Sequence, residues 1–147
     1  MSLIPRAEPA RRTAAMRKPK APEANRARIL QAGIDEVASR GFKGASMDAI
    51  ASRTHTTRAL INYYFGSKEQ VYLAVLEQVY AEIREAEGDL DLEHLAPAEA
   101  IRRIVEFTYD YYHAHQYFVR TVVAENQAKG RHFRKSKAMR TLNRPII

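Results

Sequence analysis

The chain has 147 residues, a formal net charge of +7 and no cysteine. The lack of cysteine excludes a disulfide framework, a thiolate zinc site and a cysteine nucleophile, and it is consistent with a reducing cytoplasm. No apolar run approaches the roughly 18 residues of a membrane span, and the N-terminus lacks the apolar segment of a secretory signal. The content of 46% hydrophobic and 28% charged residues is typical of a soluble globular protein.

The positive charge lies at the two ends of the chain. Residues 1–22 have a net charge of +5 and residues 129–147 of +7, whereas residues 23–83 are neutral and residues 84–128 have −5. Because prolines and basic residues dominate residues 1–22, we expect a disordered basic arm there. A non-native leader or a solubilising tail is an equally good interpretation. The basic C-terminal stretch could neutralise the acidic middle by packing or by a dimer contact.

A helical period begins near Glu23. Leu30, Ile34 and Val37 are spaced for one face of a helix, and Gly41 follows at the position where a helix ends in a left-handed residue. The charged residues of this segment fall outside the apolar stripe: Arg26, Asp35, Glu36 and Arg40.

Two short helices follow. Ser46 is a suitable N-cap for a helix over residues 47–53, and Thr57 for a helix over residues 58–65. Short helices joined by a four-residue turn form a helix-turn-helix, whose second helix enters the major groove of DNA. The sequence therefore predicts a DNA-binding unit over residues 46–65.

The side chains of the second short helix suit the two faces that such a helix needs. Arg58 can contact a guanine edge or a phosphate, Asn62 an adenine edge or a phosphate, and Tyr63 and Tyr64 phosphates. The inner face has apolar residues available at positions 60, 61 and 65: Leu60, Ile61 and Phe65.

A longer helix is predicted from residue 68 to about residue 87. Ser67 and Gln70 form a capping-box pattern at its start, and Val71, Val75 and Val79 continue an apolar stripe. Lys68 lies near the positive end of the helix dipole, which is favourable only if an anion such as a phosphate lies there.

The remaining residues predict two more helices. Pro97 suits the first position of a fifth helix, and a sixth covers residues 118–127, after which Gly130 begins a polar basic stretch. One face of the fifth helix carries Ile101, Ile104, Val105, Thr108, Tyr112 and His115. No alternating strand pattern competes, so the expected fold class is all-α.

Residues 26–83 resemble the DNA-binding domain of the tetracycline-repressor (TetR) family. Three segments carry this resemblance: RILQAGIDEVASRGF at 28–42, SMDAIASR at 46–53 and, most specifically, ALINYYFGSKE at 59–69. The resemblance implies an all-α homodimer in which the three-helix DNA-binding domain (residues 23–83) is joined by the long fourth helix to a helical effector and dimerisation domain. Of that second domain, residues 84–147 would form a part.

The family's roles transfer to matching positions of this chain. The resemblance implies that Ser46 contacts a phosphate, that Arg58 reads a base, and that Lys68 binds a phosphate. The complete set of expected DNA contacts is Ser46, Thr57, Arg58, Asn62, Tyr63, Tyr64 and Lys68. The basic arm could follow the minor groove beside them.

One departure from the family's pattern lies in the turn. The family usually has a small residue, a glycine and an apolar residue, where this chain has Thr54, His55 and Thr56. Histidine tolerates left-handed backbone better than most residues, although at a higher cost than glycine. The departure is the only support for an alternative function, an all-α ligand-binding or protein-interaction module that does not read DNA specifically.

An aromatic cluster is a candidate effector pocket, because such pockets are aromatic with few polar groups. Ordinary core packing explains the cluster equally well. The candidate lining residues are Phe107, Tyr111, Tyr112, His115 and Phe118. His113 and His115 point in opposite directions on a helix, so we expect no metal site there.

The expected function is that of a DNA-binding transcriptional regulator, a ligand-responsive repressor that binds a palindromic operator as a dimer in the cytoplasm. Its partners would be operator DNA, a second copy and an unidentified small-molecule effector, with no membrane and no cofactor. The sequence contains no catalytic motif, so no enzyme activity is predicted.

Overall fold

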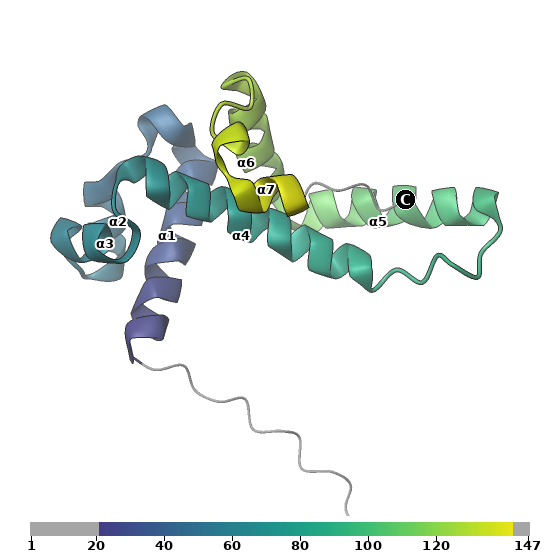
Figure 1. The fold of residues 1–147 in the computed structure, drawn as a ribbon, viewed down its shortest axis with the longest axis horizontal. Helices are drawn as coiled ribbons and strands as arrows, with labels where there is room; N and C mark the ends of the chain where they lie inside the picture. The colour runs from purple at the N-terminus through teal and green to yellow at the C-terminus, as the bar shows by residue number, and fades with distance from the viewer. Residues whose placement is uncertain (1–20, 143–147) are drawn as a thin grey trace, which may run out of the picture.

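The computed structural model describes residues 21–142, which form helices and, within that range, no strand. In chain order the helices are α1 (Ala21–Gly44), α2 (Met47–Thr54), α3 (Arg58–Phe65), α4 (Lys68–Gly88), α5 (Pro97–Ala114), α6 (Gln116–Gln127), the 3₁₀ helix η1 (Phe133–Lys135) and α7 (Lys137–Leu142). The all-α prediction is confirmed. Figure 1 shows α4 running along the molecule, with α1, α2 and α3 gathered at one end and α5 extending towards the other.

The core lies around α1 and α4. Helix α1 packs against α2, α4 and α6, and α7 packs against α4. The predicted stripes of α1 and α4 are buried, as are the inner residues of α2. These buried residues are Leu30, Ile34 and Val37 in α1, Met47, Ile50 and Ala51 in α2, and Val71, Val75 and Val79 in α4. The periodicity of this half therefore predicted its packing.

The first helix begins earlier than the predicted arm allowed. Ala21 and Pro22 are already helical, which is compatible with the proline because the first turn of a helix needs no amide donor there. Gly41 has φ 68°, so the helix is broken where the sequence predicted, and a last helical turn continues to Gly44. The rest of the predicted arm, residues 1–20, lies outside the described residues.

The apolar face predicted for the fifth helix is largely exposed in α5. Ile101, Val105 and Tyr112 are 63%, 61% and 41% exposed. Helix α5 packs on α6 instead through Tyr111, because the ring of Tyr111 lies 5.7 Å from that of Phe118. Among the described residues, nothing covers the side of α5 that carries Ile101 and Val105.

The polar basic stretch after Gly130, for which the sequence predicted no helix, is helical in part. It forms η1 and α7, and the fully buried Met139 anchors α7 to the core. The Ser136 hydroxyl accepts the Met139 amide at 3.1 Å and donates to Glu77 of α4 at 2.6 Å. Capping and a few apolar contacts, of which only Met139 is fully buried, thus fold a segment that lacks an apolar stripe.

Candidate nucleic-acid interface

The two short helices are held by side-chain caps at their N-termini. The Ser46 hydroxyl accepts the Ala49 amide at 3.3 Å, and the Thr57 hydroxyl accepts the Leu60 amide at 3.2 Å. Helix α2 extends one residue further than predicted, to Thr54, and α3 has the predicted bounds. Both caps leave the first turns of these helices with free amides and a partial positive charge, which favour phosphate.

The turn between α2 and α3 accommodates its unusual residues. His55 adopts the left-handed conformation, with φ 53° and ψ 39°. The Thr54 hydroxyl donates to the Ile50 carbonyl at 2.8 Å and lies 2.8 Å from the Thr56 hydroxyl. The hydroxyls of this turn are therefore paired with each other and with α2, and the helix-turn-helix geometry persists without glycine.

The outer face of α3 presents the residues that the sequence predicted. Asn62 is exposed, and Tyr63 is 81% exposed although it is a large aromatic residue. Tyr64 is half-buried and packs against the core, with its ring 5.4 Å from that of Tyr63. The inner face is apolar as expected but less buried, because only Ile61 is fully buried. Leu60 and Phe65 are half-buried.

Arg58 lies in the first turn of α3. Its guanidinium is 3.7 Å from the Asp48 carboxylate of α2, and both side chains are mostly exposed. A surface ion pair of this kind contributes at most about 1 kcal/mol, so it does not prevent Arg58 from contacting another group.

Lys68 at the start of α4 is positioned by neighbours from α1. Its ammonium donates to the Lys43 carbonyl at 3.4 Å and lies 4.8 Å from the centre of the Phe42 ring. The Ser67 hydroxyl accepts the Gln70 amide at 3.2 Å. The described residues show no reciprocal bond from the Gln70 side chain, so only half of the predicted capping box forms. The lysine that would bind a phosphate is therefore held near the N-terminus of α2, which follows Lys43 closely in the chain.

Glu36 is the residue of this half that the sequence analysis placed wrongly. It is fully buried, not on the polar face, because it lies one helical heptad after the buried Ile29. One carboxylate oxygen accepts the Ser46 amide and lies near Arg40, both at 3.4 Å. The other oxygen lies 3.4 Å from Arg53, although without hydrogen-bond geometry. Glu36 thus ties α1 to both ends of α2, and its heptad relation to Ile29 was the signal.

The predicted effector residues come together, but mainly as packed rings. His115 stacks on Tyr111 at 4.0 Å, and Phe118 is buried. Phe107 lies beside Tyr111 at 5.6 Å, and Tyr112 beside Phe118 at 5.5 Å. An open hollow beside them is lined by Tyr111 and His115 of this set and by carboxylates of α4 and the following loop: Glu82, Glu85 and Asp89. An effector site there stays a prediction.

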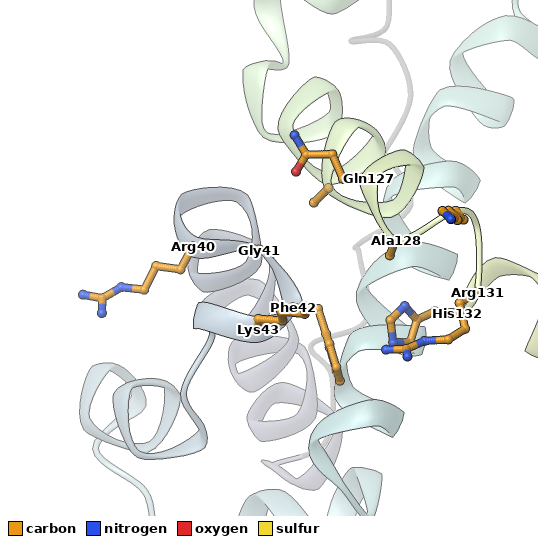
Figure 2. A pocket seen from close by; sticks show the side chains of 10 residues that line it. Arg40, Gly41, Phe42, Lys43, Gln127, Ala128, Arg131 and His132 are labelled. Carbon is orange, nitrogen blue, oxygen red and sulfur yellow. The ribbon is translucent and has the colours of Figure 1, made fainter.

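Another cavity, of about 380 Å³, lies between the end of α1 and the end of α6. Figure 2 shows Phe42 and Lys43 on its α1 side, with Ala128, Arg131 and His132 on the other. The sequence analysis did not predict this cavity, because its two walls are separated by about 80 residues of chain.

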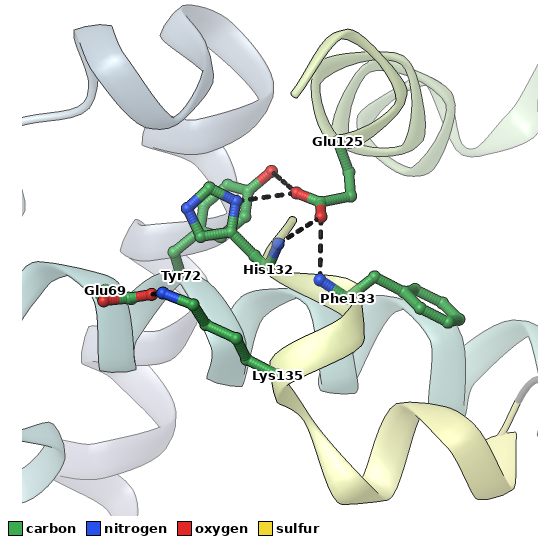
Figure 3. A network of polar contacts seen from close by, with 6 residues as sticks. All are labelled: Glu69, Tyr72, Glu125, His132, Phe133 and Lys135. Atoms are coloured by element: carbon green, nitrogen blue, oxygen red, sulfur yellow. Dashed lines mark hydrogen bonds and ion pairs between the residues drawn. The ribbon is translucent and has the colours of Figure 1, made fainter. Parts of the chain in front are cut away.

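A buried polar network lies next to this cavity and joins the two halves of the chain (Figure 3). The Glu125 carboxylate accepts the Tyr72 hydroxyl at 3.0 Å, the His132 and Phe133 amides at 2.8 Å, and has the His132 Nδ1 at 3.0 Å. Burial, with the neighbouring Glu125 charge, raises the pKa of Tyr72 well above its ordinary value. A network in which one carboxylate accepts from three residues fixes α6 and the following segment against α4.

A tyrosine of α6 makes a second link to α4. The Tyr117 hydroxyl donates to the Glu82 carboxylate at 2.7 Å. Burial and this bond raise the pKa of Tyr117 above its ordinary value. Within the described range, no three His, Cys, Asp or Glu side chains are arranged to hold a metal ion. None of the helices in that range is long and apolar enough to cross a membrane.

Comparisons with known proteins agree with this geometry. Residues 29–75 match the family model described as bacterial regulatory proteins, tetR family, and residues 97–147 match the model described as tetracyclin repressor-like, C-terminal domain. A crystal structure of a TetR-like transcriptional regulator from Rhodococcus sp. RHA1 shares the fold, with a TM-score of 0.59 and 23% identity, over 86% of this chain and 74% of that one.

Three curated relatives are named as transcriptional regulators. The chain is 38% identical to the HTH-type transcriptional repressor NicS of Pseudomonas putida, over 87% of this chain and 65% of that protein. It is 32% identical to the HTH-type transcriptional repressor SCO4008 of Streptomyces coelicolor, over 74% and 53% respectively. It is 31% identical to the HTH-type transcriptional regulator RutR of Escherichia coli, over 74% and 52%. The chain therefore spans between half and two thirds of the length of these relatives.

Proposed function

Because this chain belongs to the TetR family of bacterial regulatory proteins, we propose that it is a sequence-specific, DNA-binding transcriptional repressor. The observation that carries the proposal is the outer face of α3, where Arg58, Asn62 and Tyr63 are exposed on a helix capped by Thr57. A helix of this kind fits the major groove, with its N-terminal residues towards the base edges.

The proposed contacts divide into base readers and phosphate contacts. Arg58 and Asn62 read base edges, whereas Ser46, Thr57, Tyr63, Tyr64 and Lys68 contact phosphates. The three capped N-termini of α2, α3 and α4 support the phosphate contacts, because each adds free amides and partial positive charge.

We further propose that the protein acts in the cytoplasm as a homodimer on a pseudo-palindromic operator, with one α3 in each half-site. Residues 23–83 would form the DNA-binding domain and residues 84–147 part of an effector and dimerisation domain. An effector would change operator affinity only if it binds one spacing of the two α3 helices more tightly than another. The aromatic residues of α5 and α6 are the proposed contacts for a small-molecule effector.

The geometry of the turn removes the only argument for the alternative function, an all-α module that does not read DNA specifically. Its only support was the sequence Thr54-His55-Thr56, and these residues form a regular turn between α2 and α3. The enzyme alternative has no motif behind it, and the relatives are named as transcriptional regulators.

The test is selection of operator sequences from random DNA, followed by binding measurements on Arg58→Ala. We expect this variant to lose about 1–3 kcal/mol on the selected operator and to relax specificity at one base position. Arg102→Ala is the matched control, because Arg102 is an equally exposed arginine of α5 that pairs with Glu99 at 3.5 Å. Equal losses on operator and random DNA would show that Arg58 does not read a base.

Lys68→Met separates the phosphate role from base readout. Methionine keeps an apolar stem over the Phe42 ring but removes the charge. We expect weaker binding to all sequences alike and a salt dependence shallower by about one charge. If no DNA sequence is enriched by the wild-type protein at matched salt, the proposed function is wrong.

A further inference from the structure

We propose that the cavity between the end of α1 and the end of α6 binds a small organic anion. Its volume of about 380 Å³ suits a single small molecule. Its walls come from the DNA-binding half on one side and from the segment after α6 on the other (Figure 2). It is separate from the aromatic residues of α5, none of which lines it.

The charged residues of the cavity are all basic. Lys43 stands on the α1 side, and Lys129 and Arg131 stand on the other side. Arg40 also lines it, but its guanidinium is near the buried Glu36 carboxylate, and Figure 2 shows its side chain extending away from α6. No carboxylate is among the lining residues in the described part of the chain. Cations gathered at one concave surface without an acidic partner attract an anion.

The rest of the lining is small and apolar. Gly41, Phe42, Ala124 and Ala128 form it, and a Cβ placed on Gly41 would lie 3.9 Å from the Ala124 Cβ. Gly41 and the two alanines thus keep larger side chains out of this wall beside Phe42. Apolar walls with cations beside them fit a ring or chain that carries a carboxylate better than they fit a bare phosphate. A DNA backbone would leave these apolar walls without a partner.

His132 adds a fixed polar group to the cavity. The side chain is 99% buried, and Glu125 holds its Nδ1 at 3.0 Å. With Nδ1–H donated to this carboxylate, Nε2 of the neutral ring is an acceptor with no hydrogen-bond partner among residues 21–142. It therefore suits a hydroxyl or N–H group on the organic part of the ligand, whereas the lysine and arginine side chains suit its carboxylate. The ring also packs 4.4 Å from Phe42, so the occupant would touch two rings that hold each other in place.

The proposed site gives a role to two basic residues of the C-terminal stretch. Lys135 pairs with Glu69 of α4, whereas Lys129 and Arg131 pair with no carboxylate among the described residues. Neither forms a direct ion pair with a described carboxylate, although Arg131 is close enough to Glu69 to help lower the pKa of that carboxyl. Both can therefore contact an external anion at the cavity.

The experiment is a two-dimensional NMR titration of the 147-residue chain with benzoate, with its neutral analogue benzamide, and with inorganic phosphate. We expect benzoate to shift the amides of Gly41, Lys43, Ala128 and Arg131 saturably. Benzamide lacks the charge and phosphate lacks the apolar body, so each should bind at least about tenfold more weakly.

Variants locate the site. Arg131→Ala should weaken benzoate binding about tenfold, because it removes a charged partner. Arg134→Ala removes the same charge from the same basic stretch outside the cavity, and it should bind benzoate as the wild type does. Ala124→Leu fills the cavity without changing the charge, and it should abolish the saturable shifts.

Three results would overturn the proposal. Equal binding of benzoate and benzamide would show that the cations do not select an anion. An equal loss in Arg131→Ala and Arg134→Ala would show a general charge effect. If benzoate causes no saturable shift while Arg131→Ala weakens binding to random-sequence DNA, the cations form a DNA contact and not a small-molecule site.

Discussion

The helix-turn-helix half and the half containing α5 and α6 reach their structures by different means. Helices α2, α3 and α4 each begin with a serine or threonine whose hydroxyl accepts an amide of the first turn: Ser46, Thr57 and Ser67. The N-cap residues of α5 and α6, Ala96 and His115, make no side-chain cap. Local signals therefore define the first half, and tertiary contacts define the second.

The helix-turn-helix half also buries more of its apolar residues than the half containing α5 and α6. Only three of the nineteen buried apolar residues in the described range lie beyond Ile83: Tyr111, Phe118 and Met139. Five of its six exposed large apolar residues lie on α5 and α6. Helical periodicity therefore shows that a helix has an apolar face but not what covers that face.

The largest difference in stability between the two halves should come from an isoleucine-to-alanine substitution made once in each half. Ile61 of α3 is 0% exposed and Ile101 of α5 is 63% exposed. Ile61→Ala should lower the free energy of unfolding by about 2–5 kcal/mol, because it leaves a cavity in the core. Ile101→Ala should change it by less than about 0.5 kcal/mol. Urea denaturation measures both, and similar losses would mean that α5 has a covered face in solution.

A second substitution tests whether the two halves are held together by the buried network. Glu125→Gln replaces an acceptor that takes hydrogen bonds from Tyr72, His132 and Phe133, and it places an amide donor against these donors. We expect a loss of about 1–3 kcal/mol in the free energy of unfolding. Glu106→Gln, on an exposed residue of α5, is the control and should be neutral. A neutral Glu125→Gln would show that the network is not needed.

The network also shows why parts of the site were beyond prediction. Ser46, Thr57 and the bounds of α3 followed from caps and period, which act over three or four residues. The contact of Tyr72 with Glu125 joins residues 53 positions apart, and the cavity joins α1 to α6. Such contacts depend on how helices cross, which no local pattern determines. Glu36 is the intermediate case, because its heptad relation to Ile29 was visible but its charge favoured the surface.

A capping serine can be removed from a helix of the first half and introduced before a helix of the second. Ser67→Ala should lower the free energy of unfolding by about 1 kcal/mol, because the Gln70 amide loses its acceptor. Ala96→Ser supplies a cap to α5, whose preceding backbone is already extended at φ −62° and ψ 149°, and should raise stability by up to about 1 kcal/mol. Denaturation by urea tests both. If Ala96→Ser has no effect, α5 is limited by its packing and not by its N-terminus.

The smallest effect should come from an exposed ion pair that also joins the two halves. Lys135 of η1 donates to the Glu69 carboxylate of α4, and this bond lowers the pKa of Glu69 below its ordinary value. A carboxyl with a lowered pKa in the folded state stabilises the fold above its unfolded pKa of about 4.3, and the contribution is lost as pH falls through the folded pKa. Glu69→Gln should therefore be slightly less stable than the wild type at pH 7, and the difference should disappear in acid. Thermal unfolding from pH 7 to 2 measures this, with Glu106→Gln as the control for a lost surface charge. A difference that persists unchanged in acid would assign the effect to lost packing, since only the ionised Glu69 gains from Lys135.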